Sequence, residues 1–436
     1  MNTILYPQPA EWEALLKRPV KDAADLNRLV ADVLAEVKAN GDRAVKAYEQ
    51  KFDHVELNDL RVSEEEFQEA EQMVGTELKQ AIALAQANIE KFHATQRFHG
   101  EHCQVTAGVE CWQKSIAIEK VGLYIPGGTA PLFSTVLMLG VPARIAGCKE
   151  IVLCTPPQRD GRVNPAVLVA ARMAGVTQVF KAGGVQAIGA MAYGTESVPR
   201  VYKIFGPGNQ FVMCAKQQVS LHDVAIDMPA GPSEVMVLAD ETSNPAFVAA
   251  DLLSQAEHGV DSQVVMLTTD EAMAKAVESE VERQVSLLPR QEIARKSLDN
   301  SKLIVLKNDD DMMRMANLYA PEHLIIETRN YMQLAERVVN AGSVFLGGLT
   351  PESAGDYASG TNHTLPTNGY ATAYSGVNLD SYMRKVTFQH ITADGVRTIG
   401  PAVEKMAEAE GLDAHRMAML LRRESLQKSP IYIRRK

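Results

Sequence analysis

Residues 150–182, EIVLCTPPQRDGRVNPAVLVAARMAGVTQVFKA, contain a complete strand–helix–strand unit. The apolar run Glu150–Thr155 predicts a buried strand, Pro165–Ala174 predicts a helix, and Gln178–Ala182 predicts a second strand. Proline and glycine residues between them predict short, tight connections. A strand, a crossover helix and a second strand are typical of a parallel sheet, so we predict the α/β fold class.

The same alternation continues on both sides of this unit. Towards the second half of the chain, a new block of strands and helices begins at Ser233. Its predicted strands are 234–238, 263–268, 302–307, 324–327 and 342–346. We therefore predict two doubly wound, incomplete Rossmann-like α/β domains, with an N-terminal arm and a small helical C-terminal unit.

Changes of pattern along the chain give the predicted domain boundaries. Residues 1–21 are expected to form the arm, and residues 377–436 the helical C-terminal unit. The first α/β domain is predicted to combine 22–120, whose N-terminal portion is helical, with 233–376. Residues 121–232 are predicted to form the second α/β domain.

Composition narrows the class of protein. The formal net charge is −10, from 44 Lys and Arg against 54 Asp and Glu, which argues against a nucleic-acid partner. No uninterrupted apolar run is long enough for a membrane span, and the first residues do not resemble a secretory signal. The five cysteines include no Cys-x-x-Cys pair, which favours a reduced, cytoplasmic protein.

A candidate metal site lies at the end of a predicted helix, where residues 254–259 read SQAEHG. Gln255 and His258 are three positions apart, so on a helix they share one face and could bind one metal ion. An exposed polar helix end is the alternative interpretation, because histidine is the only strong ligand of the pair.

Further ligands are available elsewhere in the chain. Residues 350–368 have no regular periodicity and contain Asp356 and His363, and a loop of this length usually carries function. His415, with Glu410 nearby, lies in the C-terminal unit. Two histidines, one carboxylate and one amide oxygen would suit Zn²⁺, although spacing alone leaves this set open because its members come from three regions.

Four glycine-rich segments follow predicted strands, where open α/β sheets bind ligands. They are Tyr124–Gly128, Ala182–Gln186, Phe205–Asn209 and Pro229–Ser233. None contains a Gly-x-Gly-x-x-Gly or a Gly-x-x-x-x-Gly-Lys-Ser/Thr motif, so ordinary turn glycines remain an alternative to a nucleotide site.

Glu322 and His323 place a carboxylate beside an imidazole just before an apolar strand. Both groups can act as general bases near pH 7. Neighbours within a strand point to opposite faces, so the two side chains can act together only if they lie in the turn. A surface Glu–His pair is the alternative.

The chain contains longer runs, which are VGLYIPGG at 121–128, IFGPGN at 204–209, IDMPAGPSE at 226–234, DLLSQAEHG at 251–259, PEHL at 321–324 and SAGDYASGTNH at 353–363. With these runs the chain resembles the histidinol dehydrogenases over nearly its whole length. The runs are far more specific than any three-residue pattern.

The resemblance implies roles for individual residues. It implies Zn²⁺ bound by Gln255, His258, Asp356 and, from the partner subunit of an intertwined homodimer, His415. It implies catalysis by Glu322 and His323, and NAD contacts from Tyr124, Gln186 and Asn209. Implied substrate contacts are Ser233, Gln255, His258, Glu322, His323, Asp356, His363, Glu410 and His415. The first α/β domain would then carry the zinc and catalytic residues, and the second would lie on the NAD side.

The implied reaction is the NAD-dependent four-electron oxidation of L-histidinol, through L-histidinaldehyde, to L-histidine. These are the last two steps of histidine biosynthesis. One alternative is a relative that oxidises another polyol, such as a sulfonated propanediol, with the same zinc and NAD. A second is a two-domain α/β binding protein without catalysis, and an assay for NADH distinguishes it from the enzymes.

Overall fold

The computed structural model describes residues 1–19, 24–127 and 131–428. Gly128, the boundary predicted between 21 and 22, and residues 429–436 of the predicted C-terminal unit lie outside these ranges. The chain divides into two units, each described by itself. Unit 1 combines Met1–Gln96 with Ile118–Tyr382, and unit 2 combines Arg97–Ala117 with the chain from Met383 onwards.

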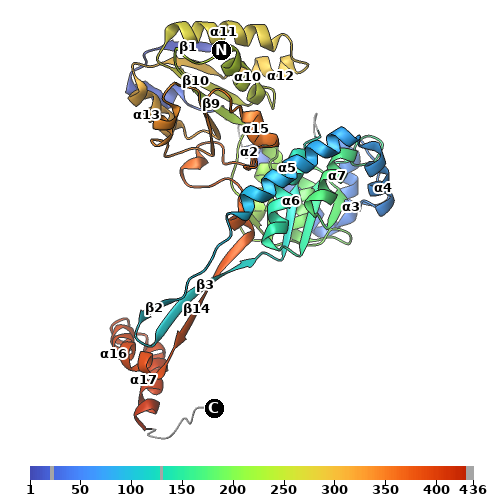
Figure 1. Ribbon diagram of the computed structural model, residues 1–436. Helices are drawn as coiled ribbons and strands as arrows, with labels where there is room; N and C mark the ends of the chain where they lie inside the picture. Colours follow the sequence, from blue (N-terminus) through green and yellow to red (C-terminus); the bar gives the residue numbers. More distant parts are fainter. Residues whose placement is uncertain (20–23, 128–130, 429–436) are drawn as a thin grey trace. The chain divides into compact units, whose positions relative to one another are not determined.

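Unit 1 contains two parallel sheets (Figure 1). The six-stranded sheet has the order β1-β11-β10-β9-β12-β13. Its strands are β1 (Asn2–Leu5), β9 (Glu234–Ala239), β10 (Gln263–Thr268), β11 (Lys302–Val305), β12 (His323–Ile326) and β13 (Ser343–Leu346). Numbered from β9, the last five have the order 3-2-1-4-5 of a doubly wound sheet, which confirms the predicted fold class.

The five-stranded sheet repeats this order as β6-β5-β4-β7-β8. Its strands are β4 (Lys120–Tyr124), β5 (Glu150–Thr155), β6 (Gln178–Lys181), β7 (Lys203–Phe205) and β8 (Ala225–Ile226). The helices between them are α6 (Phe133–Ala146), α7 (Pro165–Ala174), α8 (Gly184–Tyr193) and α9 (Gln210–Ser220). Those of the other sheet are α10 (Pro245–Ala256), α11 (Glu271–Val285), α12 (Gln291–Asp299), α13 (Asp309–Tyr319) and α14 (Tyr331–Ala335).

Local sequence explains where these helices begin and end. At α7, the Asn164 side chain accepts a hydrogen bond from the Ala166 amide, and Pro165 occupies the first turn. Gly175, with φ of 85°, ends the helix in a left-handed conformation that favours glycine. Asn244 caps α10 in the same way through the Ala246 amide.

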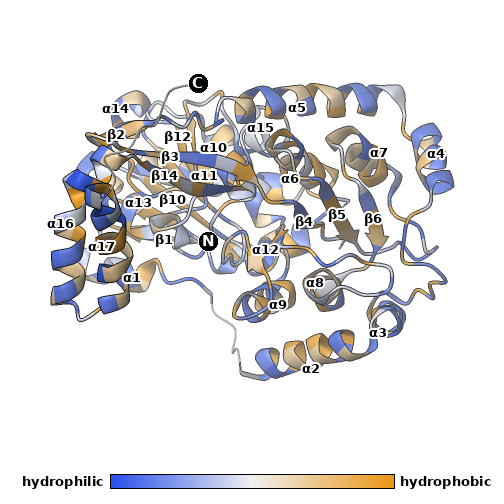
Figure 2. Cartoon of the chain, turned by 90° about the horizontal axis from the view of Figure 1, so that it is seen from below, coloured by the Kyte–Doolittle hydropathy of each residue, from blue (hydrophilic) through white to orange (hydrophobic). Residues whose placement is uncertain are grey.

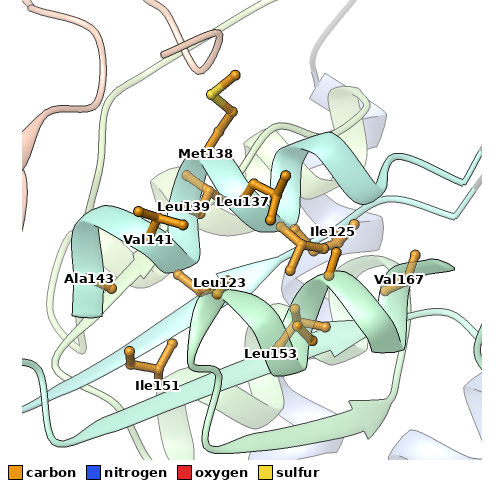
Figure 3. Close-up of a cluster of buried hydrophobic side chains, with 14 of the residues drawn as sticks. Leu123, Ile125, Leu137, Met138, Leu139, Val141, Ala143, Ile151, Leu153 and Val167 are labelled. Atoms are coloured by element: carbon orange, nitrogen blue, oxygen red, sulfur yellow. The ribbon is translucent and has the colours of Figure 1, made fainter. Parts of the chain in front are cut away.

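Both sheets are buried on two faces. The core between β4, β5, α6 and α7 contains Leu123, Ile125, Leu137, Leu153 and Val167 (Figure 3). Figure 2 shows β5 and β6 mainly in the hydrophobic colour and the surface helix α4 (Glu64–Met73) mainly in the hydrophilic one. Near-continuous apolar strands of this kind are expected when helices cover both faces of a parallel sheet.

The N-terminal helices pack on the helices that cover the five-stranded sheet, which differs from the predicted assignment of 22–120 to the first α/β domain. These helices are α2 (Ala24–Asn40), α3 (Asp42–Tyr48), α4 and α5 (Thr76–Ala94). Val30 and Leu34 share a core with Ile188 of α8, and Ile82 of α5 shares one with Leu137 of α6. The apolar stripe of a helix indicates that one face is buried, but not which sheet covers it.

The ends of the chain also differ from the prediction. The predicted arm contributes β1, which pairs with β11 as an edge strand of the six-stranded sheet. Unit 2 is not purely helical, because β14 (Met383–Ile391) pairs antiparallel with β3 (Val109–Ala117), and β3 pairs with β2 (Cys103–Thr106). Its helices are α16 (Ala393–Ala409) and α17 (Asp413–Lys428) (Figure 1). Across the described ranges, no helix is both long and apolar enough to cross a membrane.

Candidate active site

The candidate metal-binding helix end lies where the strands of the six-stranded sheet begin. Helix α10 runs back along the sheet from the end of β9, so its last turn lies near the first residues of β9 and β12. The helix ends at Ala256. Gln255 is therefore in its last turn and only 1% exposed, whereas His258 lies just beyond the helix and is exposed.

The side-chain amide of Gln255 is directed at the catalytic pair predicted from sequence. Its Nε2 atom donates to the carbonyl oxygen of Glu234 at 3.1 Å and lies 3.0 Å from Nδ1 of His323. The same atom donates to Oε2 of Glu322 at 3.3 Å. The structure thus brings together three predicted site residues from two separate segments.

Glu322 and His323 lie together at the start of β12, because Glu322 precedes the strand and His323 is its first residue. Oε2 of Glu322 accepts a hydrogen bond of 2.9 Å from the backbone amide of Glu234 and lies 3.6 Å from Nδ1 of His323. Both side chains are buried. The sequence required both residues to lie in the turn, but only Glu322 lies in the bend before β12, and His323 belongs to the strand. Their side chains still approach each other.

Asp356 and His363 approach the pair from the segment that lacked periodicity. A short helix, α15 (Glu352–Tyr357), carries Asp356, whose Oδ1 lies 3.5 Å from Nε2 of His323. Nδ1 of His363 lies 2.9 Å from the carbonyl oxygen of Asp356, and its Nε2 lies 3.0 Å from Oγ1 of Thr135. Both ring nitrogens of His363 therefore have partners, and one of them lies next to Asp356.

Several buried polar atoms here have no hydrogen-bond partner. They are Nε2 of His323, Oδ1 of Asp356 and both carboxylate oxygens of Glu352. Donor atoms of His258, Glu352 and Asp356 also lie within 4.8 Å of one another. Buried polar atoms are normally paired, and a divalent cation satisfies oxygen and nitrogen donors of this kind. The residues present therefore fit a zinc ion.

The charges around this group are dominated by carboxylates. Burial raises the pKa of Glu352 well above its usual value. Burial lowers the pKa of His323, but Glu352, Glu322 and the contact with Asp356 raise it, and the net pKa is well above its usual range. Burial also raises the pKa of Asp356, but the contact with His323 outweighs it, so the net pKa is lowered. A concentration of carboxylates favours a bound cation.

Arg18 is a contributor that the sequence did not indicate. Its Nε and Nη2 atoms donate to the two carboxylate oxygens of buried Glu234 at 2.5 and 2.9 Å, and its guanidinium lies 4.0 Å above the ring of Tyr319. Oε1 of Glu234 also accepts a hydrogen bond from the Asn368 amide. Arg18 thus holds the residue that follows Ser233 and bonds to Glu322.

The predicted NAD-contact residues lie where the strands of the five-stranded sheet end. The candidate metal site, by contrast, lies where the strands of the six-stranded sheet begin. The hydroxyl of Tyr124 accepts a hydrogen bond from the Gly184 amide at 3.0 Å. Asn209 is exposed and caps α9 through the Phe211 amide. A Cβ on Gly206 would lie 2.1 Å from the carbonyl oxygen of Tyr124, so only glycine allows β4 and β7 to approach here.

Gln186 is turned inward by a residue that the sequence did not indicate, Glu49. Nε2 of Gln186 and the amide of Gly183 both donate to Oε1 of Glu49, at 2.7 and 2.8 Å. Burial raises the pKa of Glu49 to about 7. Gln186 is 1% exposed, so its side chain supports the turn before α8 rather than facing solvent.

Two predicted site residues belong to unit 2. His415 lies on α17, Glu410 follows α16 directly, and both are exposed within that unit. The contacts that join the other predicted residues around Gln255 are all made within unit 1.

Comparisons with known proteins agree with one another. Residues 16–423 match the family model described as histidinol dehydrogenase. The chain is 64% identical over 427 residues to histidinol dehydrogenase from Bacteroides thetaiotaomicron, covering 98% of this chain and 100% of the relative. It is 51% identical over 416 residues to that of an Escherichia coli O6:H1 strain, covering 95% of each.

The fold agrees as well. A crystal structure of histidinol dehydrogenase from Elizabethkingia anophelis superposes with a TM-score of 0.96 at 54% identity, covering 98% of this chain and 99% of the other. The family match, the high identity and the shared fold extend over nearly the full length of each protein. This chain therefore belongs to the histidinol dehydrogenase family.

Proposed function

We propose that this chain oxidises L-histidinol through L-histidinaldehyde to L-histidine with NAD⁺, the last two steps of histidine biosynthesis. The observation that carries the proposal is the buried Glu322–His323 pair, with Nε2 of His323 unpartnered and facing Asp356. The named relatives support the same reaction over the full chain. They do not favour the alternatives of a sulfonated propanediol as substrate or of a binding protein without catalysis.

Gln255, His258 and Asp356 would hold zinc, with His415 supplied by a second copy of the chain in a homodimer. When bound, zinc would mainly orient the substrate, while NAD⁺ would accept a hydride in each of the two oxidations. Tyr124, Gln186 and Asn209 would lie on the NAD side. Since Gln186 and Tyr124 are buried, we assign them mainly to shaping the strand ends against which NAD⁺ binds.

His323 would be the general base. Bound zinc would offset the carboxylates that raise the pKa of His323, so the ring would be neutral in the zinc-bound site. With its proton on Nδ1, which lies 3.2 Å from the carbonyl oxygen of Glu234, the Nε2 atom would carry the free lone pair. Nε2 accepts the alcohol proton as the carbinol carbon is oxidised. After it has released this proton to water, Nε2 would accept a second one when the hydrated aldehyde is oxidised to the carboxylic acid.

Glu322 would activate the water that hydrates the aldehyde. Its Oε2 atom is fixed by the Glu234 amide, which leaves Oε1 to accept a proton from water. Ser233, His363 and Glu410 would contact the polar groups of the substrate. The same residues act in both oxidations, so the aldehyde must stay bound between them. These contacts would retain it.

The proposal places the enzyme in the cytoplasm as a homodimer. All five cysteines are free, which is consistent with a reducing compartment.

The test is an absorbance assay for NADH with L-histidinol as the limiting substrate. We expect two NADH per histidinol consumed, complete loss of activity after a chelator, and recovery with Zn²⁺. Accumulation of one NADH per histidinol would contradict the second oxidation, and faster turnover of a sulfonated propanediol would favour the other dehydrogenase. Absence of NADH formation with either substrate would leave only the binding protein.

A further inference from the structure

Cys103 and Cys111 lie directly opposite each other in the three-stranded sheet of unit 2, whose strand order is β14-β3-β2. They are paired residues of the antiparallel strands β2 and β3. Cys103 is exposed and Cys111 is half-buried, whereas the other three cysteines are buried. The proposed mechanism uses neither of these two thiols.

Side chains that are opposed in these two strands contact each other. One position before β2, His102 lies opposite Trp112, and their rings stack with centroids 4.6 Å apart and an interplanar angle of 8°. Nδ1 of His102 also lies 2.9 Å from Oε1 of Glu110, which is on the same strand as Trp112. Because successive side chains of a strand alternate between its faces, Cys103 and Cys111 lie together on the other face.

The spacing of an antiparallel pair suits a disulfide. Directly opposed residues have Cα atoms about 4.5 or 5.5 Å apart, depending on whether they exchange backbone hydrogen bonds. A disulfide spans Cα separations of about 4.4–6.8 Å, so either kind of pair falls within its range. Strand β2 lies at the edge of the sheet and residues 103–105 are exposed, so small adjustments of this strand meet little resistance.

We propose that Cys103 and Cys111 form a reversible disulfide, which fixes β2 to β3 when the protein meets a low-molecular-weight disulfide as oxidant. The thiolate of Cys103, the more exposed residue, attacks one sulfur of the oxidant, and the other sulfur leaves as a thiolate. The Cys111 thiolate then attacks the Cys103 sulfur and releases the second small thiolate. Two protein thiols are oxidised, one small disulfide is reduced to two thiols, and these take up the two protons that the cysteines lost.

The buried cysteines are poorly suited to this exchange. Burial raises the pKa of Cys148 to about 12 and also raises the pKa values of Cys154 and Cys214. The thiolate is the reacting form of cysteine, and an oxidant must also reach it. The exchange therefore selects the opposed pair on the surface of unit 2.

The β2–β3 hairpin also supports the helices of unit 2. The carbonyl oxygen of Gly108, in the turn of the hairpin, accepts a hydrogen bond of 2.9 Å from the amide of Thr392. Thr392 caps the first turn of α16, the helix that Glu410 follows. A disulfide across the hairpin would therefore stiffen the base on which α16 begins.

The test exposes the full-length, reduced protein to oxidised glutathione under native conditions and determines its mass and its linked peptides without reductant. We expect the wild type to lose two hydrogen atoms and to yield a peptide that joins Cys103 to Cys111, and dithiothreitol should reverse both changes. Cys111→Ser should instead keep a glutathione adduct on Cys103. Cys214→Ser is the matched control, because it removes a buried cysteine and should behave as the wild type.

Other products would overturn the proposal. These are a wild type that keeps both thiols, one that keeps glutathione on Cys103 without the internal link, or one in which Cys103 joins a second chain. Before oxidation, Cys103→Ser and Cys111→Ser should form NADH at the wild-type rate, which shows that both variants fold.

Hydrogen exchange tests whether the link fixes the edge strand. We expect the amides of residues 103–106 to exchange about 10-fold more slowly in the oxidised wild type than in the reduced protein, because opening of β2 is suppressed. Oxidised Cys111→Ser should exchange at the reduced rate. Equal exchange rates in the oxidised and reduced wild type would overturn the stiffening of the hairpin.

Discussion

Oε1 of Glu49 accepts a hydrogen bond of 2.7 Å from the side-chain amide of Gln186, although 137 positions separate the two residues. The same oxygen accepts a bond of 2.8 Å from the Gly183 amide. Glu49 therefore fixes the turn between β6 and α8, one of the glycine-rich strand ends that we place on the NAD side. This contact leads to two predictions.

Replacing Glu49 by leucine should lower the free energy of unfolding by about 2–4 kcal/mol, because two buried N–H donors lose their acceptor. Urea denaturation followed by circular dichroism measures the change. Glu49→Gln keeps a carbonyl acceptor and is the matched control, so it should retain most of the stability. Equal losses in the two variants would show that the lost bonds are not the cause.

Stability should fall as pH rises from about 4.5 to 7, and Glu49 should account for part of the fall. Its pKa is about 7 in the folded protein against an ordinary value of 4.5, so the folded state binds the proton more tightly. The contribution is complete below the unfolded pKa, is lost as pH rises through the folded pKa, and amounts to about 3 kcal/mol. Below pH 7 the free energy of unfolding should fall more steeply with pH in the wild type than in Glu49→Gln. Above pH 7 the two curves should have the same slope. Parallel curves below that pH would contradict the assignment.

Substitutions of Glu322 and His323, the proposed catalytic pair, should affect the two oxidations differently. His323→Asn should slow both by about 10²- to 10⁴-fold, since one nitrogen accepts the proton in each. Glu322→Gln should spare alcohol oxidation and slow aldehyde oxidation, because only the second step needs activated water. Single-turnover formation of NADH from histidinol and from histidinaldehyde distinguishes them. Unchanged aldehyde oxidation by Glu322→Gln would remove the water-activating role.

Sharing of the site between two chains predicts complementation. His258→Asn and His415→Asn should each be inactive as homodimers. In a mixed dimer, one site carries both substitutions and the other carries neither, so activity should return to about half of the wild-type value per dimer. Differently tagged chains allow the mixed dimers to be purified and assayed. Absence of activity in verified mixed dimers would contradict a shared site.

Arg18 should be required for stability through its bond to Glu234. Arg18→Met leaves a buried carboxylate without its cation, at a cost of about 3–5 kcal/mol in the free energy of unfolding. Glu234→Gln in the same chain removes that unpaired charge and should recover part of the loss. Denaturation of the two single variants and the double variant completes the cycle. Additive losses would mean that the ion pair contributes little.

For helices and strands with strong local signals, the first and last residues could be predicted from sequence. The bounds expected for β5, α7 and β10 agree with those observed, because apolar runs, caps and glycines mark both ends. The contributions of Glu49, Arg18 and Glu352 could not be predicted in this way. Glu49 and Arg18 meet partners more than 130 positions away, and Glu352 lies on a six-residue helix too short to show a period. Their roles depend on tertiary packing.

The helices at the two candidate sites present opposite ends of their dipoles. A helix carries a partial positive charge at its first turn and a partial negative charge, about half an elementary charge, at its last. Helix α10 ends beside Glu322 and His323, so its dipole favours a metal cation and a positively charged substrate. Helices α8 and α9 begin at the strand ends on the other sheet, where their dipoles favour the phosphates of a dinucleotide. Two sheets with one strand order would therefore favour ligands of opposite charge, because the proposed sites lie at opposite edges of the strands.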